Sequence, residues 1–181
     1  MSYAHKCFTE EQLKAWLQVV LNRQSVNLYL IFDGAAVPSD DFKLIYSGFE
    51  KEFEIINLFS GTVDECILES APWLVCIDQL PKLFASRSFE RLSELNQTLS
   101  CMSFLATERP VSELKSQLQF LSDIQMRNGK NALLRYYDPR IVPTFLLIME
   151  KADVKINELV KYWVVFSPST KQYIVYYWDA A

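Results

Sequence analysis

The feature that most constrains the fold is a run of residues that is apolar on both faces of an extended chain. Asn27-Leu28-Tyr29-Leu30-Ile31-Phe32 has no charged side chain, and it ends at Asp33-Gly34. Strands that are covered on both faces carry runs of this kind, and a glycine tolerates the sharp turn that follows such a strand. The sequence therefore predicts a central strand of a sheet with other layers packed on both sides.

Further strand and helix patterns follow along the chain. The runs Trp73–Asp78 and Ser100–Leu105 predict two more buried strands. Thr9 and Gln12 have the spacing of a capping box, which marks the start of a helix. Asn128-Gly129 lies between two strand-like runs and predicts a hairpin. Helical spacing of apolar residues also predicts helices near residues 9–22 and 110–121.

The order of these elements indicates the fold class. Alternating strands and helices predict an α/β fold, with a mixed β-sheet flanked by helices and with a C-terminal helical and hairpin portion. Residues 1–150 are expected to form an α/β core, and residues 151–181 a C-terminal helix and β-hairpin annex. The annex is either a unit of its own or part of one domain with the core.

Composition excludes several classes of function. The 181 residues include 18 basic and 22 acidic ones, a net charge of −4, with no basic stripe, so no nucleic-acid partner is expected. No apolar run is long enough to predict membrane insertion. The four cysteines lack metal-site spacing, and a single histidine cannot supply a histidine-based metal site. The chain is therefore expected to be a cytoplasmic protein in a reducing compartment, without cofactor or metal.

Two carboxylates provide the alternative of an enzyme. Asp33 and Asp78 each end a predicted strand, and α/β sites form at strand ends. If the two strand ends were adjacent, the pair could act as acid and base or bind a divalent metal. The competing interpretation is structural, with Asp33 capping the turn before Gly34 and Asp78 capping the segment at Pro81.

The segment from Arg135 to Arg140 has a local structural interpretation. Asp138 is a good N-cap and Pro139 is typical of a first helical turn, so the sequence predicts a helix over residues 139–150. Arg140 is expected to pair with a nearby carboxylate such as Asp33. The alternative is that Asp138 and Arg140 form an exposed recognition pair.

The last predicted strand is aromatic on both faces. Tyr173 and Tyr177 share one face, and Tyr176 and Trp178 share the other. Tyrosine and tryptophan are enriched in the cores of protein interfaces. These four residues are therefore partner-binding candidates, while burial in the core of the sheet is the competing interpretation.

Several motifs, taken together, resemble a known family. Leu44–Gly48, Ala71–Asp78 and above all Leu134–Arg140 are similar to segments of the Tap/TEC family, the adaptor-chaperones of bacterial type VI secretion effectors. Tyr29–Ala35 resembles the opening strand of that family, with its Asp-Gly-Ala. The resemblance covers residues 27–149 and is most specific at the Tyr-Asp-Pro-Arg string.

The resemblance implies a cytosolic protein that is not an enzyme. Such an adaptor binds a type VI secretion effector, commonly through the effector's N-terminal region, and helps to load it onto the spike protein. A third alternative is an immunity-type protein that blocks a toxin. The residues that match the family signature, with an expected structural role, are Asp33, Gly34, Tyr137, Asp138, Pro139 and Arg140.

Overall fold

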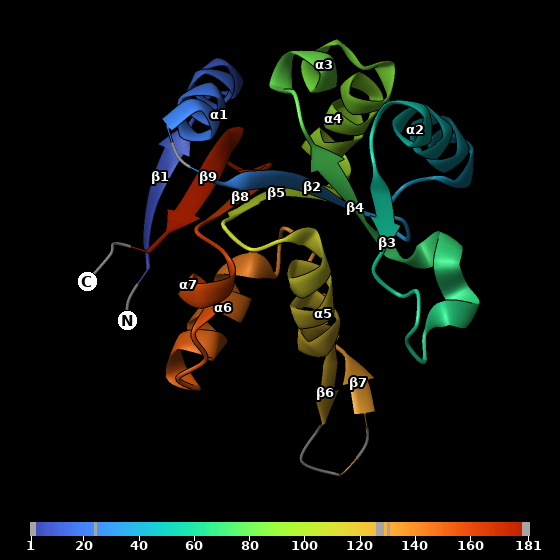
Figure 1. The fold of residues 1–181 in the computed structure, drawn as a ribbon, viewed down its shortest axis with the longest axis vertical. Coiled ribbons are helices and arrows are strands. Elements are labelled where there is room, and N and C mark those ends of the chain that lie inside the picture. Colours follow the sequence, from blue (N-terminus) through green and yellow to red (C-terminus); the bar gives the residue numbers. More distant parts are fainter. Residues whose placement is uncertain (1–2, 24, 126–128, 130, 179–181) are drawn as a thin grey trace.

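A seven-stranded sheet forms the centre of the protein. The computed structural model describes residues 3–23, 25–125, 129 and 131–178. Within them, the sheet has the strand order β1-β9-β8-β5-β2-β4-β3 (Figure 1). The strands are β1 (Ala4–Phe8), β2 (Asn27–Asp33), β3 (Ile55–Asn57), β4 (Pro72–Ile77), β5 (Met102–Thr107), β8 (Tyr162–Ser167) and β9 (Gln172–Tyr177).

Helices cover both faces of this sheet (Figure 1). On one face lie α1 (Glu10–Arg23), α2 (Ser39–Glu52), α3 (Leu80–Ala85) and α4 (Arg87–Leu99). On the other face lie α5 (Val111–Ser122), α6 (Val142–Lys151) and α7 (Ile156–Leu159). A short 3-10 helix, η1 (Glu65–Ser70), follows β3. None of the helices in the described ranges is long and apolar enough to cross a membrane.

The central strand β2 explains the run of apolar residues. Leu28, Leu30 and Phe32 pack into the core under α1 to α4, while Tyr29 and Ile31 pack into the core on the side of α5 to α7. Successive side chains of a strand point to opposite faces, so a strand between two helical layers must be apolar at every position. The predicted α/β class, with a central strand covered on both faces, is confirmed.

Strand direction is more regular than the mixed sheet suggested by the sequence. Every neighbouring pair of strands in the described sheet is antiparallel. Helical connections usually join parallel strands. Here β4 and β5, joined through α3 and α4, both pair with β2, which lies between them. The inserted strand makes each direct pairing antiparallel.

The C-terminal helix and hairpin portion packs into the same sheet. β8 pairs with β5, and β9 pairs with β8 on one side and β1 on the other. The expected hairpin over these residues is confirmed, and its strands occupy interior positions of the sheet. The N-terminal strand β1, which the sequence did not indicate, covers the outer edge of β9.

A second, two-stranded sheet projects beyond α5 (Figure 1). It consists of β6 (Asp123–Gln125) and β7 (Asn131–Leu133), paired antiparallel with Ile124 opposite Ala132. This confirms the hairpin predicted around Asn128-Gly129, although Asn128 itself lies outside the described residues. Gly129 has φ of 76°, a left-handed conformation that favours glycine.

Candidate functional site

Asp33 ties the end of the central strand to residues 134–140, which we call the signature segment. Its backbone N–H donates to Cys101 O at 2.8 Å, and its Oδ1 accepts the Ala35 N–H at 3.0 Å. Its Oδ2 accepts a hydrogen bond from Nη2 of Arg135, just after β7. The Asp33 side chain is 1% exposed and that of Arg135 is 40% exposed. The carboxylate is thus buried, while its partner reaches solvent.

Burial dominates the electrostatics of this pair. Burial raises the pKa of the Asp33 carboxyl above its ordinary value, and the attraction of Arg135 offsets the rise only in part. The pKa of Arg135 is also raised: burial opposes the rise, but the charge and hydrogen bond of Asp33 outweigh it. The buried Asp33 carboxylate therefore depends on Arg135 for its charge to be tolerated at this depth.

The expected helix cap at Asp138 is not formed. Asp138 Oδ1 accepts both the backbone N–H and the Nε–H of Arg140 at 2.9 Å, and Oδ2 accepts from Nη2 at 2.6 Å. The Ile141 N–H closes the turn on the Asp138 carbonyl at 2.9 Å. Helix α6 begins only at Val142, with Ile141 as its N-cap. Because Arg140 occupies the carboxylate, Asp138 holds a turn before the helix.

The partner predicted for Arg140 also differs in the structure. Arg140 pairs with Asp138, and it is Arg135 that pairs with Asp33. Five of the six signature residues are buried, and Arg140 is exposed. The buried ones are Asp33, Gly34, Tyr137, Asp138 and Pro139. In this arrangement the signature residues hold the end of β2 against the segment that follows β7.

Replacing Asp138 with alanine is expected to lower the free energy of unfolding at pH 7 by about 1–2 kcal/mol, a value reduced because Arg140 is exposed. Burial alone would raise the pKa of the Asp138 carboxyl, but its hydrogen bonds from Arg140 outweigh this, so the pKa is lowered. The stabilisation is therefore fully present above the ordinary aspartate pKa of about 4, and it is lost as pH falls through the lowered pKa of Asp138.

Urea unfolding of the wild type, Asp138→Ala and Asp138→Asn, followed between about pH 3 and pH 7, measures this effect. Asparagine keeps an acceptor for the Arg140 N–H, so its cost should be the smaller of the two. A stability difference between wild type and Asp138→Ala that did not shrink on acidification would contradict the assignment.

The carboxylate pair proposed for an enzyme is not brought together. β2 and β4 run antiparallel, with Asp33 opposite Pro72 and Leu28 opposite Ile77. Asp78 follows Ile77, so it lies at the other end of the strands, about 15–20 Å from Asp33 at the usual rise per residue. Antiparallel pairing therefore places Asp33 and Asp78 at opposite ends of the two paired strands. Among the residues that the structure describes, no group of three or more side chains could hold a metal ion.

The four aromatic candidates of the last strand divide into two pairs. Tyr173 and Tyr176 are buried, whereas Tyr177 and Trp178 are half-buried. Burial raises the pKa of both Tyr173 and Tyr176 to about 12. The first pair is covered because β9 is flanked by strands on both sides and helices pack above it. Tyr173 and Tyr176 are therefore core residues and offer no contact surface to a partner.

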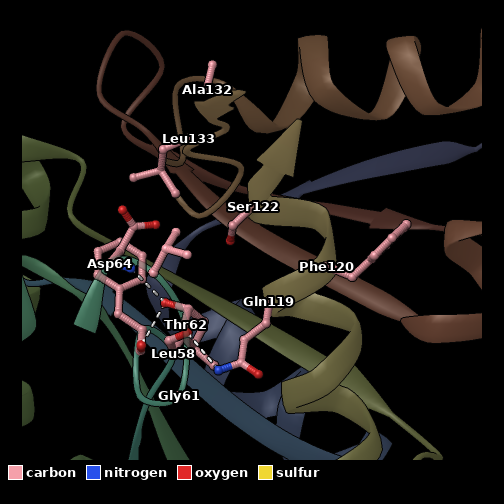
Figure 2. Close-up of a pocket in the computed structure, with 11 residues that line it drawn as sticks. Leu58, Gly61, Thr62, Asp64, Gln119, Phe120, Ser122, Ala132 and Leu133 are labelled. Atoms are coloured by element: carbon pink, nitrogen blue, oxygen red, sulfur yellow. Dashed lines mark hydrogen bonds between the residues drawn. The ribbon is translucent and has the colours of Figure 1, made fainter. Parts of the chain in front are cut away.

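An apolar groove lies on the side of the molecule that carries the second sheet. It has a volume of about 450 Å³ and is bounded by the loop of residues 58–64, the end of α5 and strand β7 (Figure 2). Val63 is 91% exposed and Phe120 is 75% exposed, and Leu133 is also exposed. Figure 2 shows that the Phe120 side chain extends away from Leu133, so these side chains stand around the groove and do not form one packed patch. Exposed apolar side chains around a hollow mark a site of interaction.

Hydrogen bonds fix one wall of the groove. Gln119 Nε2 donates to the carbonyl of Leu58 at 3.1 Å (Figure 2). It also donates to the carbonyl of Ser60 at 2.9 Å, and the two bonds tie the loop to α5. Within the loop, the Thr62 hydroxyl donates to Phe59 O at 2.7 Å and accepts the Asp64 N–H at 3.2 Å. These bonds within the chain hold the loop in place, as in a largely pre-formed binding site.

The groove adjoins the signature cluster. The pKa of Tyr137 is raised to about 12, by burial first and then by the charge of Asp33, with a smaller contribution from Asp64. Leu133 lines the groove and stands two positions before Arg135, so the groove and the signature segment are neighbours along the chain. One signal in the sequence could have indicated this groove: Phe120 lies outside the apolar face formed by Leu114 and Leu118 on α5.

The fold and this surface define a three-layer α/β protein with an apolar groove beside a projecting hairpin. The chain belongs to the family described as "Domain of unknown function (DUF4123)", whose model matches residues 28–155. That range includes β2, the groove and the signature segment, and it ends before β8. No curated protein and no solved structure gives a significant match.

Proposed function

We infer that this protein is a cytoplasmic adaptor-chaperone that binds a type VI secretion effector and helps to load it onto the spike protein. The observation that carries the proposal is the exposed apolar groove with its pre-formed wall, which has the character of a surface that receives another protein. The family match over residues 28–155 coincides with the range in which the motifs resemble the Tap/TEC adaptors, and this supports the proposal.

The chemistry of the signature cluster agrees with an adaptor. Arg140 of the signature and its neighbour Arg135 each pair with a carboxylate of the same chain, Arg140 with Asp138 and Arg135 with Asp33. Charges paired in this way hold a scaffold in shape. The signature residues would then hold the scaffold in shape, and the partner would contact the apolar residues of the groove.

Co-expression with the effector encoded in the same gene cluster tests the proposal. The expected result is a complex that co-purifies at high salt, since apolar contacts are not screened by ions. Deletion of the gene should abolish export of the effector. An effector from an unrelated gene cluster serves as the control and should not be retained.

Two outcomes would contradict the adaptor function. One is the lack of a salt-tolerant complex with either the effector or the spike protein. The other is a complex that neutralises the toxic activity while export proceeds normally in the deletion strain, which would identify an immunity-type protein.

A further inference from the structure

The small sheet beside the groove has an open edge. In the pairing of β6 with β7, the Leu134 N–H donates to Ser122 O at 2.8 Å, and Asp123 lies opposite Leu133. Antiparallel strands alternate between pairs that exchange hydrogen bonds and pairs that do not. Leu133 is therefore in a pair that does not, and its N–H and carbonyl point away from β6. Among the described residues, no further strand pairs with β7.

This open edge faces the groove. β7 lies on the side of β6 nearer to the segment of residues 58–70 (Figure 1). Leu133 and Ala132 line the groove together with the loop of residues 58–64 (Figure 2). Two-stranded sheets are marginal alone and are stabilised by a third strand. Unpaired backbone groups beside apolar pockets are the elements by which extended peptides are bound.

Charge restricts what can occupy the site. Among the described residues that line the groove, Asp64 is the one that carries a charge, and its neighbour Glu65 is exposed. A second copy of this chain, related by twofold symmetry, would bring acidic groups near each other and would be disfavoured. A partner segment with a basic side chain would instead complement Asp64.

We propose that β7 and the groove form a docking site for an extended segment of the partner protein. The segment adds to the Leu133 edge as a third strand, with an apolar side chain against Val63 and a basic side chain beside Asp64. On the basis of the proposed function, this segment belongs to the effector. Backbone hydrogen bonds would give affinity, and the groove would select the side chains.

Paired substitutions at Leu133 test the strand addition. Leu133→Pro removes an N–H that bonds to nothing in the described chain, and proline is tolerated at a strand edge. Leu133→Ala keeps the N–H and removes only side-chain contacts. Binding of the effector should weaken by about tenfold or more in Leu133→Pro, and by less in Leu133→Ala. Equal binding by wild type and Leu133→Pro would overturn the proposal.

A second set of variants tests the groove without altering the backbone. The variant Val63→Ser should also weaken binding by about tenfold or more. Ile148→Ser on α6 and Leu44→Ser on α2 remove exposed apolar side chains elsewhere and are the matched controls. If the groove and control variants bound the effector equally well, the docking site would be wrong while the adaptor function stood.

A defined peptide makes the test independent of the effector. The probe is Thr-Val-Lys-Val-Thr-Val-Lys-Val-Thr, compared with the same peptide carrying glutamate for lysine. At saturating concentration the lysine peptide should slow hydrogen exchange of the Leu133 amide, and the glutamate peptide should bind more weakly. No slowing at Leu133, or equal binding of both peptides, would overturn the proposal.

The oligomeric state provides the last test, in the absence of any partner. Light scattering should give a monomer for both wild type and Leu133→Pro. A wild-type dimer that Leu133→Pro converts to a monomer would show that the edge is occupied by a second copy, against the proposal.

Discussion

Replacing Trp163 with alanine is expected to lower the free energy of unfolding by about 3–5 kcal/mol, the range for truncating a large buried aromatic side chain. Trp163 is fully buried on β8. Its ring makes edge contacts with Tyr136 at 6.1 Å and Phe145 at 5.7 Å between centroids. Alanine would leave a cavity between the sheet and α6 that the surrounding rings cannot fill.

The manner of unfolding is as informative as the size of the effect. β8 pairs with β5 in the middle of the sheet, so we expect one cooperative transition, shifted to lower urea and measured by far-UV circular dichroism. Trp178→Ala is the control, because Trp178 is half-buried and follows β9. It should lower the free energy of unfolding by less than about 1 kcal/mol. Loss of structure confined to residues 151–181 would show instead that this portion folds as a separate annex.

Replacing Arg135 with methionine is expected to cost about 2–3 kcal/mol, below the usual range for breaking a buried pair because Arg135 is partly exposed. The cause is the carboxylate left behind: Asp33 is buried and would lose its charged partner. Asp33→Asn should cost less, about 1 kcal/mol, since Arg135 can turn to water and an amide can still accept the Ala35 N–H.

The double variant Asp33→Asn with Arg135→Met separates the two contributions. It should be more stable than Arg135→Met alone, because no buried charge remains. The pKa of Asp33 is already raised, and loss of Arg135 should raise it further. The native state then takes up a proton more readily than the unfolded chain, so the cost of Arg135→Met should shrink as pH falls. Thermal unfolding across a pH series would detect this. A larger cost for Asp33→Asn than for Arg135→Met would contradict this account.

Features that depend on neighbouring residues were predictable. The capping box is formed as expected, with the Thr9 N–H donating to Gln12 Oε1 at 2.9 Å and the Gln12 N–H to Thr9 Oγ1 at 3.3 Å. The buried strands β2, β4 and β5 and the two hairpins also lie where their patterns indicated. The helix start at Asp138 was wrong: Asp138 closes a separate turn with the N–H groups of Arg140 and Ile141, and α6 begins only at Val142.

The candidate site was much less predictable. Of the partner-binding candidates, Tyr173 and Tyr176 proved to be core residues, since a strand pattern that is aromatic on both faces does not show whether neighbours cover it. The groove was missed because its walls come from three separate segments. Phe120, off the apolar face of α5, was the one local signal. Val63 and Leu133 are unremarkable in their own surroundings, and only the fold brings them to the same groove.

By itself the sequence determined the local elements and the α/β class, because hydrophobic period, caps and turn residues act over a few neighbouring positions. The tertiary structure alone decided strand order, the separation of Asp33 from Asp78, the pairing of Asp33 with Arg135 and the position of the groove. The two members of that ion pair are 102 positions apart. Contacts of such range depend on how the strands pair across the whole sheet, and no local pattern records that pairing.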